Sequence, residues 1–201
     1  DERLTKLAEL VHPGRIVPTP VEIVESAGLV NGASKGEGLG NQFLGNIRET
    51  DAIIHVLRCF DDGIVVHVDG SVDPVRDKEI IDTELQLKDL ETVENRIKRV
   101  EKIAQVGGDK NAKLEYAVLL AYKEALLQGK SARSVQFESK EEQKAAKGLF
   151  LLTSKPVLYV CNVDEASAAT GNHYVEQVRE AVKDEGAEVL VWAAQTEADI
   201  A

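Results

Sequence analysis

The 201-residue chain is predicted to adopt an α/β fold, in which a parallel sheet with flanking helices carries an inserted antiparallel helical hairpin. Three observations support this prediction. Apolar runs of strand length alternate with helical periodicity at both ends of the chain, as in sheets built with right-handed crossovers. The middle of the chain has apolar residues spaced three and four apart over two long stretches. Hydrophobic residues make up 43% of the chain, which is ordinary for a folded globular protein.

The first predicted part, residues 1–72, begins with a short amphipathic helix that ends at Pro13-Gly14. Residues 16–24 are predicted to be extended, and the end of this run, Ile23-Val24, to be a buried strand. Five glycines between residues 28 and 40 then predict a loop, because glycine allows positive φ and close approach to a ligand.

A helix over residues 41–49 and a strand over Ile53–Leu57 complete this first part. The unbroken apolar run of that strand is typical of a parallel sheet that is covered on both faces.

The second part, residues 73–147, is predicted to be the hairpin, with coiled-coil-like packing between two helices. Gly107-Gly108 separates the helices and Gly129 ends the second one. Their inward positions are Leu90, Val93, Ile97, Val100 and Ala104 in the first helix, and Leu119, Tyr122 and Leu126 in the second. Ser139 and Glu142 have the spacing of a capping box, which predicts the start of a further short helix.

The third part, residues 148–201, is predicted to return to the sheet. It should form a strand over Val157–Cys161, a helix over Tyr174–Asp184 that Gly186 ends, and a strand over Val189–Trp192. Strand, helix and strand in this order predict parallel pairing.

Charge and cysteine content limit the possible functions. The net charge is −11, but residues 76–147 hold 15 basic and 14 acidic residues, a net of +1, so the remainder carries −12. An acidic surface discourages non-specific binding to nucleic acid, so any polyanion contact should involve the middle segment. No sequence-specific DNA binding is expected. Two cysteines, Cys59 and Cys161, suggest no disulfide framework and fit a cytoplasmic protein. The sequence has no apolar stretch of about twenty residues, so no membrane span is predicted. His55 and His67 have no other ligand-type residues at a suitable spacing, so no metal site is predicted either.

Two segments resemble a known family. The stretch from Gly28 to Leu44, followed by Asn46–Ala52, is similar to the switch II region of the YchF/Obg-like ATPases, which are P-loop NTPases of the translation-factor-related class. Asn162-Val163-Asp164-Glu165 is similar to the family's Asn-x-x-Glu base-recognition motif, where other GTPases carry Asn-Lys-x-Asp. The resemblance spans nearly all of the chain in the same order.

This resemblance implies a partial P-loop NTPase fold and a ribosome-associated, cytoplasmic protein that binds ATP with Mg²⁺ and hydrolyses it at the β–γ bond. Two alternatives remain open at this point. One is a non-catalytic interaction module that uses the helical arm to bind a protein partner. The other is a GTP-binding protein.

The resemblance also implies a base pocket at Asn162, Val163 and Glu165, with Ala193-Ala194 offering a backbone amide to the base. In GTPases the acidic residue accepts hydrogen bonds from guanine, and adenine has no donors at those positions. A glutamate, one methylene longer than aspartate, is consistent with ATP. The structural alternative is an asparagine that caps the next helix.

For the phosphates, the resemblance assigns the Gly28 amide to the γ-phosphate. Glu25 stands where the family has an aspartate that holds Mg²⁺ through water, so a metal role there departs from the pattern. Leu29 stands where Ras-like enzymes place the glutamine that orients water, so no catalytic residue is assigned.

The chain contains no Gly-x-x-x-x-Gly-Lys-Ser/Thr, the loop that cradles phosphates and magnesium. The 201 residues also leave no room for the TGS domain that the family usually carries at its C-terminal end. The expectation is a fragment with little or no activity alone. Because the family's first strand lies inside the sheet, its loss predicts unpaired strand edges, reduced stability and self-association.

Arg96, Arg99 and Lys102 share one helical face of the predicted hairpin. They have two interpretations: contact with ribosomal RNA, or a solvated face paired with nearby acids, such as Glu94 with Lys98.

Overall fold

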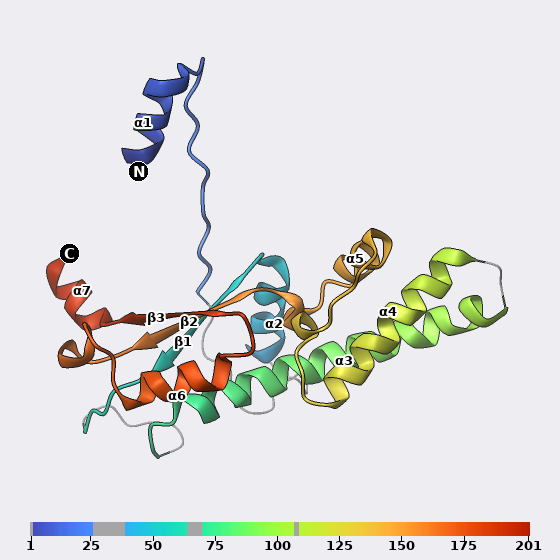
Figure 1. The fold of residues 1–201 in the computed structure, drawn as a ribbon. Coiled ribbons are helices and arrows are strands. Elements are labelled where there is room, and N and C mark those ends of the chain that lie inside the picture. Colours follow the sequence, from blue (N-terminus) through green and yellow to red (C-terminus); the bar gives the residue numbers. More distant parts are fainter. Residues whose placement is uncertain (1, 26–38, 64–69, 107–108) are drawn as a thin grey trace.

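The fold is taken from a computed structural model, which describes residues 2–25, 39–63, 70–106 and 109–201 (Figure 1). Its centre is a parallel sheet in the order β1-β2-β3. Leu57 of β1 pairs with Cys161 of β2, which pairs in turn with Val191 of β3. The predicted parallel sheet is therefore confirmed. The strands are β1 (Ile53–Arg58), β2 (Val157–Asn162) and β3 (Glu188–Trp192).

One face of this sheet is buried against a helix. Tyr159 and Cys161 of β2 are fully buried, and they cluster with Val175 and Val178 of α6 (His173–Val182). The predicted crossover helix thus covers the sheet as expected.

On the other face of the sheet the two outer strands are exposed, whereas Val160 of the central strand β2 is buried between them. Ile54 is 53% exposed and Val56 is 60% exposed, and Leu190 and Trp192 of β3 are also exposed. The prediction that the first of these strands is covered on both faces is therefore wrong. Exposure alternates along β1, so Ile54 and Val56 lie on the exposed side of this strand.

The N-terminal region stands away from the sheet (Figure 1). Helix α1 (Glu2–Val11) forms as predicted but buries none of its residues. The predicted buried strand at Ile23-Val24 is wrong: the segment has no strand, and these side chains are 78% and 47% exposed. An extended segment becomes a strand only when another strand satisfies its backbone, and no such partner exists among the described residues. The glycine-rich loop lies outside the described residues.

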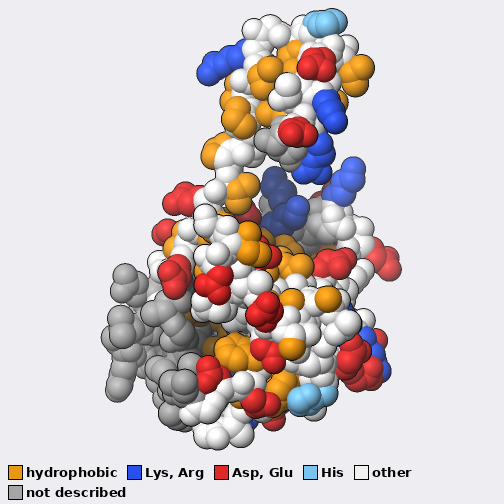
Figure 2. All heavy atoms as spheres, turned by 90° about the vertical axis from the view of Figure 1, so that its left-hand side faces the viewer, with side chains coloured by type: hydrophobic (Ala, Val, Ile, Leu, Met, Phe, Trp, Pro, Cys, Tyr) orange, Lys and Arg blue, Asp and Glu red, His pale blue; other side chains and the backbone are white. Residues whose placement is uncertain are grey.

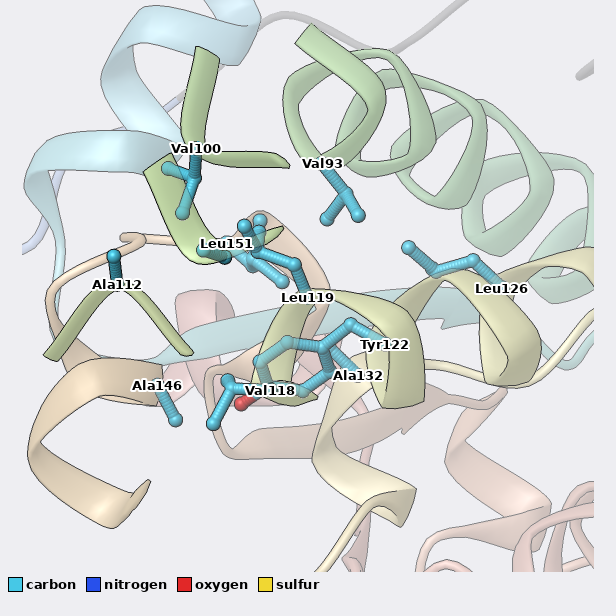
Figure 3. Packing of buried hydrophobic residues seen from close by; sticks show 11 residues of the cluster. Val93, Val100, Ala112, Val118, Leu119, Tyr122, Leu126, Ala132, Ala146 and Leu151 are labelled. Atoms are coloured by element: carbon cyan, nitrogen blue, oxygen red, sulfur yellow. The ribbon is translucent and has the colours of Figure 1, made fainter. Parts of the chain in front are cut away.

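The hairpin forms an elongated arm (Figure 1). Helix α3 (Pro74–Val106) packs on α4 (Lys110–Leu127), and Val93, Leu119 and Leu126 lie in their shared core (Figure 3). The predicted inward positions are confirmed as the arm's hydrophobic seam, in which Leu90 and Ile97 are only partly buried. Among helices in the described ranges, none combines the length and hydrophobicity of a membrane span.

The remaining elements are short helical segments before, between and after the arm and the strands. The capping box is confirmed: the Glu142 amide donates to the Ser139 hydroxyl at 3.1 Å, and the Ser139 amide donates to the Glu142 carboxylate at 3.1 Å. Leu44 and Ile47 of α2 pack on Leu152. These elements are α2 (Leu39–Glu49), η2 (Ala132–Ser134), α5 (Lys140–Lys147), η3 (Leu152–Ser154), η4 (Glu165–Ser167) and α7 (Ala194–Ile200).

A buried carboxylate fastens the arm to the chain that returns to the sheet. Asp89 of α3 accepts the backbone amides of Leu152 and Thr153, each at 2.7 Å. It also accepts the Thr153 hydroxyl at 2.7 Å, while that hydroxyl oxygen accepts the Ala132 amide at 2.9 Å. Burial raises the pKa of Asp89, although these donors favour its charged form.

Candidate functional site at the ends of β2 and β3

The candidate base site lies where two parallel strands end, which is where ligands bind in open α/β sheets. Asn162 is the last residue of β2 and pairs with Trp192, the last residue of β3. The Ala194 amide donates to the Asn162 side-chain oxygen at 3.1 Å. The Val163 amide donates to the Trp192 carbonyl at 2.9 Å. Four of the predicted residues, Asn162, Val163, Ala193 and Ala194, therefore come together.

These residues differ in how deeply they are buried. Val163 and Ala193 are buried in the same hydrophobic cluster, whereas Asn162 is half-buried. The Asn162 side chain is held by the hydrogen bond from Ala194, which fixes its orientation. Its amide NH₂ group remains as a donor beside that contact, because the oxygen is the atom that Ala194 engages.

Glu165 occupies an exposed position beside this pair. It begins η4, a short turn held by Asp164, whose carboxylate accepts the Ser167 amide at 2.9 Å. The Glu165 carboxylate projects from a turn that other residues fix. This carboxylate is exposed, and the cap of the turn is Asp164.

Asn172 organises the same end of the sheet and was not among the predicted site residues. Its side-chain oxygen caps α6 by accepting the Val175 amide at 3.2 Å, and its NH₂ group donates to the Cys59 carbonyl at 2.8 Å. The same NH₂ group lies 3.4 Å from the Ser167 hydroxyl. The sequence signal for the cap was an asparagine directly before a helix, but the bridge to Cys59 is a long-range contact that no local pattern shows.

The two cysteines lie buried below this site. Cys59 continues the ladder beyond β1, since its amide donates to the Asn162 carbonyl at 2.8 Å. The thiols of Cys59 and Cys161 share a hydrogen bond, which together with burial raises the pKa of Cys59.

The phosphate half of the site cannot be assembled from the described residues. Gly28 and Leu29 lie outside them, and Glu25 is an exposed residue at the end of the segment 12–25. The described ranges contain no group of three or more His, Cys, Asp or Glu side chains suited to a metal ion. Of the residues predicted for the phosphate side, Glu25 is described and Gly28 and Leu29 are not, so the magnesium assignment stays a prediction.

The His55 side chain packs against a neighbouring strand of the sheet. Its ring lies 5.7 Å from that of Tyr159, and burial lowers its pKa below the ordinary value of 6.5. His67 lies outside the described residues.

The end of the molecule that holds the strand termini is rich in acidic side chains (Figure 2). On the arm, Arg96 forms an ion pair with Glu115, while Arg99 and Lys102 are exposed. Glu94 forms its direct ion pair with Lys123 of α4 at 2.9 Å, and the charge of Lys98 also lowers the pKa of the Glu94 carboxylate. Helix α4 thus brings a lysine across the hairpin to this carboxylate.

Comparison with known proteins shows similarity along the whole chain. The ribosome-binding ATPase YchF of Bacillus subtilis is 53% identical over 203 residues, covering 100% of this chain and 55% of that protein. The protein of the same name from Escherichia coli O157:H7 is 51% identical over 201 residues, covering 100% of this chain and 54% of that protein. The chain thus spans about half the length of the curated relatives it matches. No protein-family model matches it.

A solved structure supports the fold. The YchF GTPase of Schizosaccharomyces pombe matches with a TM-score of 0.76 and 34% identity, covering 96% of this chain and 53% of that one. The bacterial relatives are named ATPases and this structure is named a GTPase, so the comparisons leave the choice of base to the chemistry of the site.

Proposed function

Because this chain is YchF-like along its whole length and spans about half of those relatives, we propose that it is the corresponding part of a ribosome-binding ATPase. Residues 1–72 and 148–201 belong to its nucleotide-binding domain, and residues 73–147 are a helical insertion. The relatives' name supports the ribosome as partner and a cytoplasmic location.

The observation that carries the nucleotide proposal is the hydrogen bond from the Ala194 amide to the Asn162 side chain at 3.1 Å. It joins the two loops that follow β2 and β3, so the base-binding edge is preorganised without ligand. Asn162, Val163 and Ala193-Ala194 form the wall of the pocket, and Glu165 supplies exposed acceptor oxygens beside it.

The same geometry supports ATP as the nucleotide. Adenine carries an exocyclic amino group where guanine has a carbonyl, and that group is a donor for a carboxylate. Glu165 is longer by one methylene than the aspartate of GTPases, which changes its reach relative to the guanine donors. The GTPase name of the structural relative makes GTP the second candidate.

Hydrolysis at the β–γ bond is proposed for the intact protein. We place Gly28 at the γ-phosphate and Glu25 as an outer ligand to Mg²⁺ through water, with Leu29 leaving water orientation to another group. This chain alone is expected to turn over ATP slowly or not at all, because a lysine-bearing phosphate loop is absent from its sequence.

Isothermal titration of the full chain with ATP and with GTP, each with and without Mg²⁺, tests this proposal. Wild-type chain should bind ATP in preference to GTP, and Asn162→Ala should remove that binding. Asn111→Ala on the arm is the matched control and should leave it unchanged. Preference for GTP would select the GTP-binding candidate. Absence of heat with both nucleotides, together with intact partner binding through the arm, would favour the non-catalytic module.

A further inference from the structure

An exposed tryptophan lies at the edge of the candidate base site. Trp192 is the only tryptophan of the chain, and it is the last residue of β3, where it pairs with Asn162 of β2. Its side chain is 44% exposed. Folding usually buries most of so large an apolar side chain, so an indole left this open beside a site is available to a ligand.

Strand geometry puts this indole on the same side of the sheet as the Asn162 side chain. Cys161 and Val191, one residue earlier on each strand, belong to the cluster that packs on α6. Successive side chains of a strand point to opposite faces, so Asn162 and Trp192 both point to the other face. Because paired strands lie about 4.8 Å apart, the two side chains are direct neighbours.

The row of residues at the strand ends differs from the row two residues earlier. The end row is Arg58, Asn162 and Trp192, and the earlier row is Val56, Val160 and Leu190. Within the end row, the Arg58 side chain turns to Phe60: its Nε donates to the Phe60 carbonyl at 3.1 Å, and its guanidinium lies 4.8 Å from the centre of the Phe60 ring. Trp192 therefore supplies the flat apolar surface next to Asn162.

The backbone around Trp192 is held by the same contacts that build the base site. Its carbonyl accepts the Val163 amide at 2.9 Å, and the Ala194 amide, two residues further on, donates to the Asn162 side chain at 3.1 Å. Among the contacts within the described residues, the indole itself takes part in no hydrogen bond and no ring contact. Trp192 is thus fixed at its backbone while its ring remains open to a planar ligand.

We propose that the indole of Trp192 stacks on the purine base of the bound nucleotide. This inference rests on the proposed function, because it concerns the base held in that site. Stacking uses the π-face that every base has, so it adds affinity without distinguishing adenine from guanine. Trp192 is therefore a binding residue that strengthens the complex, whereas the choice of base belongs to the hydrogen-bonding groups of Asn162 and Glu165.

Isothermal titration of the full-length Trp192→Ala chain with ATP and with GTP, each with Mg²⁺, tests this division of roles. Both affinities should fall about tenfold, and the ratio between them should stay within about twofold of the wild-type ratio. Trp192→Phe keeps an aromatic face and should lose less than about threefold. Circular dichroism should show unchanged folding in both variants, because the side chain they alter is exposed.

Leu190→Ala is the matched control. Leu190 is 48% exposed and lies on the same strand and the same face as Trp192, but two residues further from the strand end. Its substitution should leave both affinities at the wild-type value. Because the chain has a single tryptophan, ATP should also quench the intrinsic fluorescence of the wild type and of Leu190→Ala to the same extent.

Wild-type affinity in Trp192→Ala, while the wild type binds nucleotide, overturns the stacking inference and leaves the proposed function standing. An equal loss of affinity in Leu190→Ala also overturns it, since the effect would then come from the exposed face of the sheet as a whole. A loss confined to one of the two nucleotides refutes the assignment of base choice to Asn162 and Glu165. If the wild type binds neither nucleotide, the proposed base site fails, and the stacking role fails with it.

Discussion

The ammonium of Lys78 lies 2.7 Å from the Glu185 carboxylate, which joins the root of α3 to the turn between α6 and β3. Lys78 also contacts Asp82 at 2.7 Å, and the Tyr159 hydroxyl donates to Glu185 at 2.8 Å. Arg133 from η2 reaches the same carboxylate at 3.5 Å. The arm and the sheet therefore share one network of two cations and two anions at their junction.

Removing the central cation of this network should destabilise the protein. Lys78→Met leaves Glu185 and Asp82 with one fewer cation in a mostly buried site, and we expect a loss of about 3 kcal/mol in the free energy of unfolding. Urea denaturation measures it. Lys123→Met, which breaks the exposed pair with Glu94, is the control and should leave the midpoint nearly unchanged. Equal denaturation midpoints for the two variants would show that the network stabilises the protein no more than an exposed ion pair does.

Stability should fall as the pH decreases from 7 towards 5. Burial lowers the pKa of His55 from 6.5 in the native state. Below pH 6.5 the unfolded chain therefore binds more protons than the native state, and the free energy of unfolding decreases. Burial is the largest effect on the pKa of His55; Asp82 and Asp77 raise this pKa, and Lys78 and Arg133 lower it further. His55→Gln should flatten the decline of unfolding free energy between pH 6.5 and 5, measured by urea denaturation at each pH. A decline as steep as that of the wild type would contradict this.

Glu185 should cause a second decrease in the free energy of unfolding, at lower pH. Burial raises the pKa of Glu185, but hydrogen bonds from Lys78 and Tyr159 outweigh it and bring the pKa below 4.5. This contribution is therefore present above pH 4.5 and disappears as the pH falls through the lowered value. In Glu185→Gln the acid-induced loss below pH 4.5 should be smaller than in the wild type, as followed by circular dichroism.

Asp89 should be among the most sensitive positions in the chain. Asp89→Ala leaves the amides of Leu152 and Thr153 buried without an acceptor, and we expect a loss of about 4 kcal/mol, since each such group costs 1–3 kcal/mol. Thermal and urea unfolding measure the change. Glu91→Ala, two residues further along α3 and exposed, provides the comparison. A similar small effect of both substitutions would refute the assigned role.

The uncovered face of the sheet should make the isolated chain associate. Ile54 and Val56 on β1, and Leu190 and Trp192 on β3, expose apolar surface on the two strands that flank β2. Sedimentation velocity over a concentration series should show oligomers that Val56→Lys reduces. Val106→Lys at the tip of the arm removes an apolar side chain that is even more exposed than Val56, and it should leave association as it was.

Local patterns were sufficient for most helices and for the three strands of the sheet. The capping box at Ser139 and the seam through Val93 and Leu119 depend on residues close in sequence or on helical periodicity, and both are confirmed. The segment at Ile23-Val24 shows where such reasoning fails. Its composition suits a strand, but a strand also requires a neighbour, and hydrophobicity alone does not supply one.

The same contrast holds for the candidate site. Asn162, Val163, Ala193 and Ala194 meet because the carboxyl ends of parallel strands share an edge, which a sequence of strands and helices predicts. The Lys78–Glu185 contact and the bridge from Asn172 to Cys59 span more than 100 residues. No spacing rule connects such positions, so these contacts required the fold itself.

The length of α3 gives the junction at Lys78 a mechanical consequence. A helix of 33 residues is about 50 Å long, and its root is the part held by the charged network. If the root pivots by about 5°, geometry moves the far tip by about 4 Å over that length. A change at the base of the arm too small to break a hydrogen bond is thus magnified at the tip into a displacement the size of a side chain.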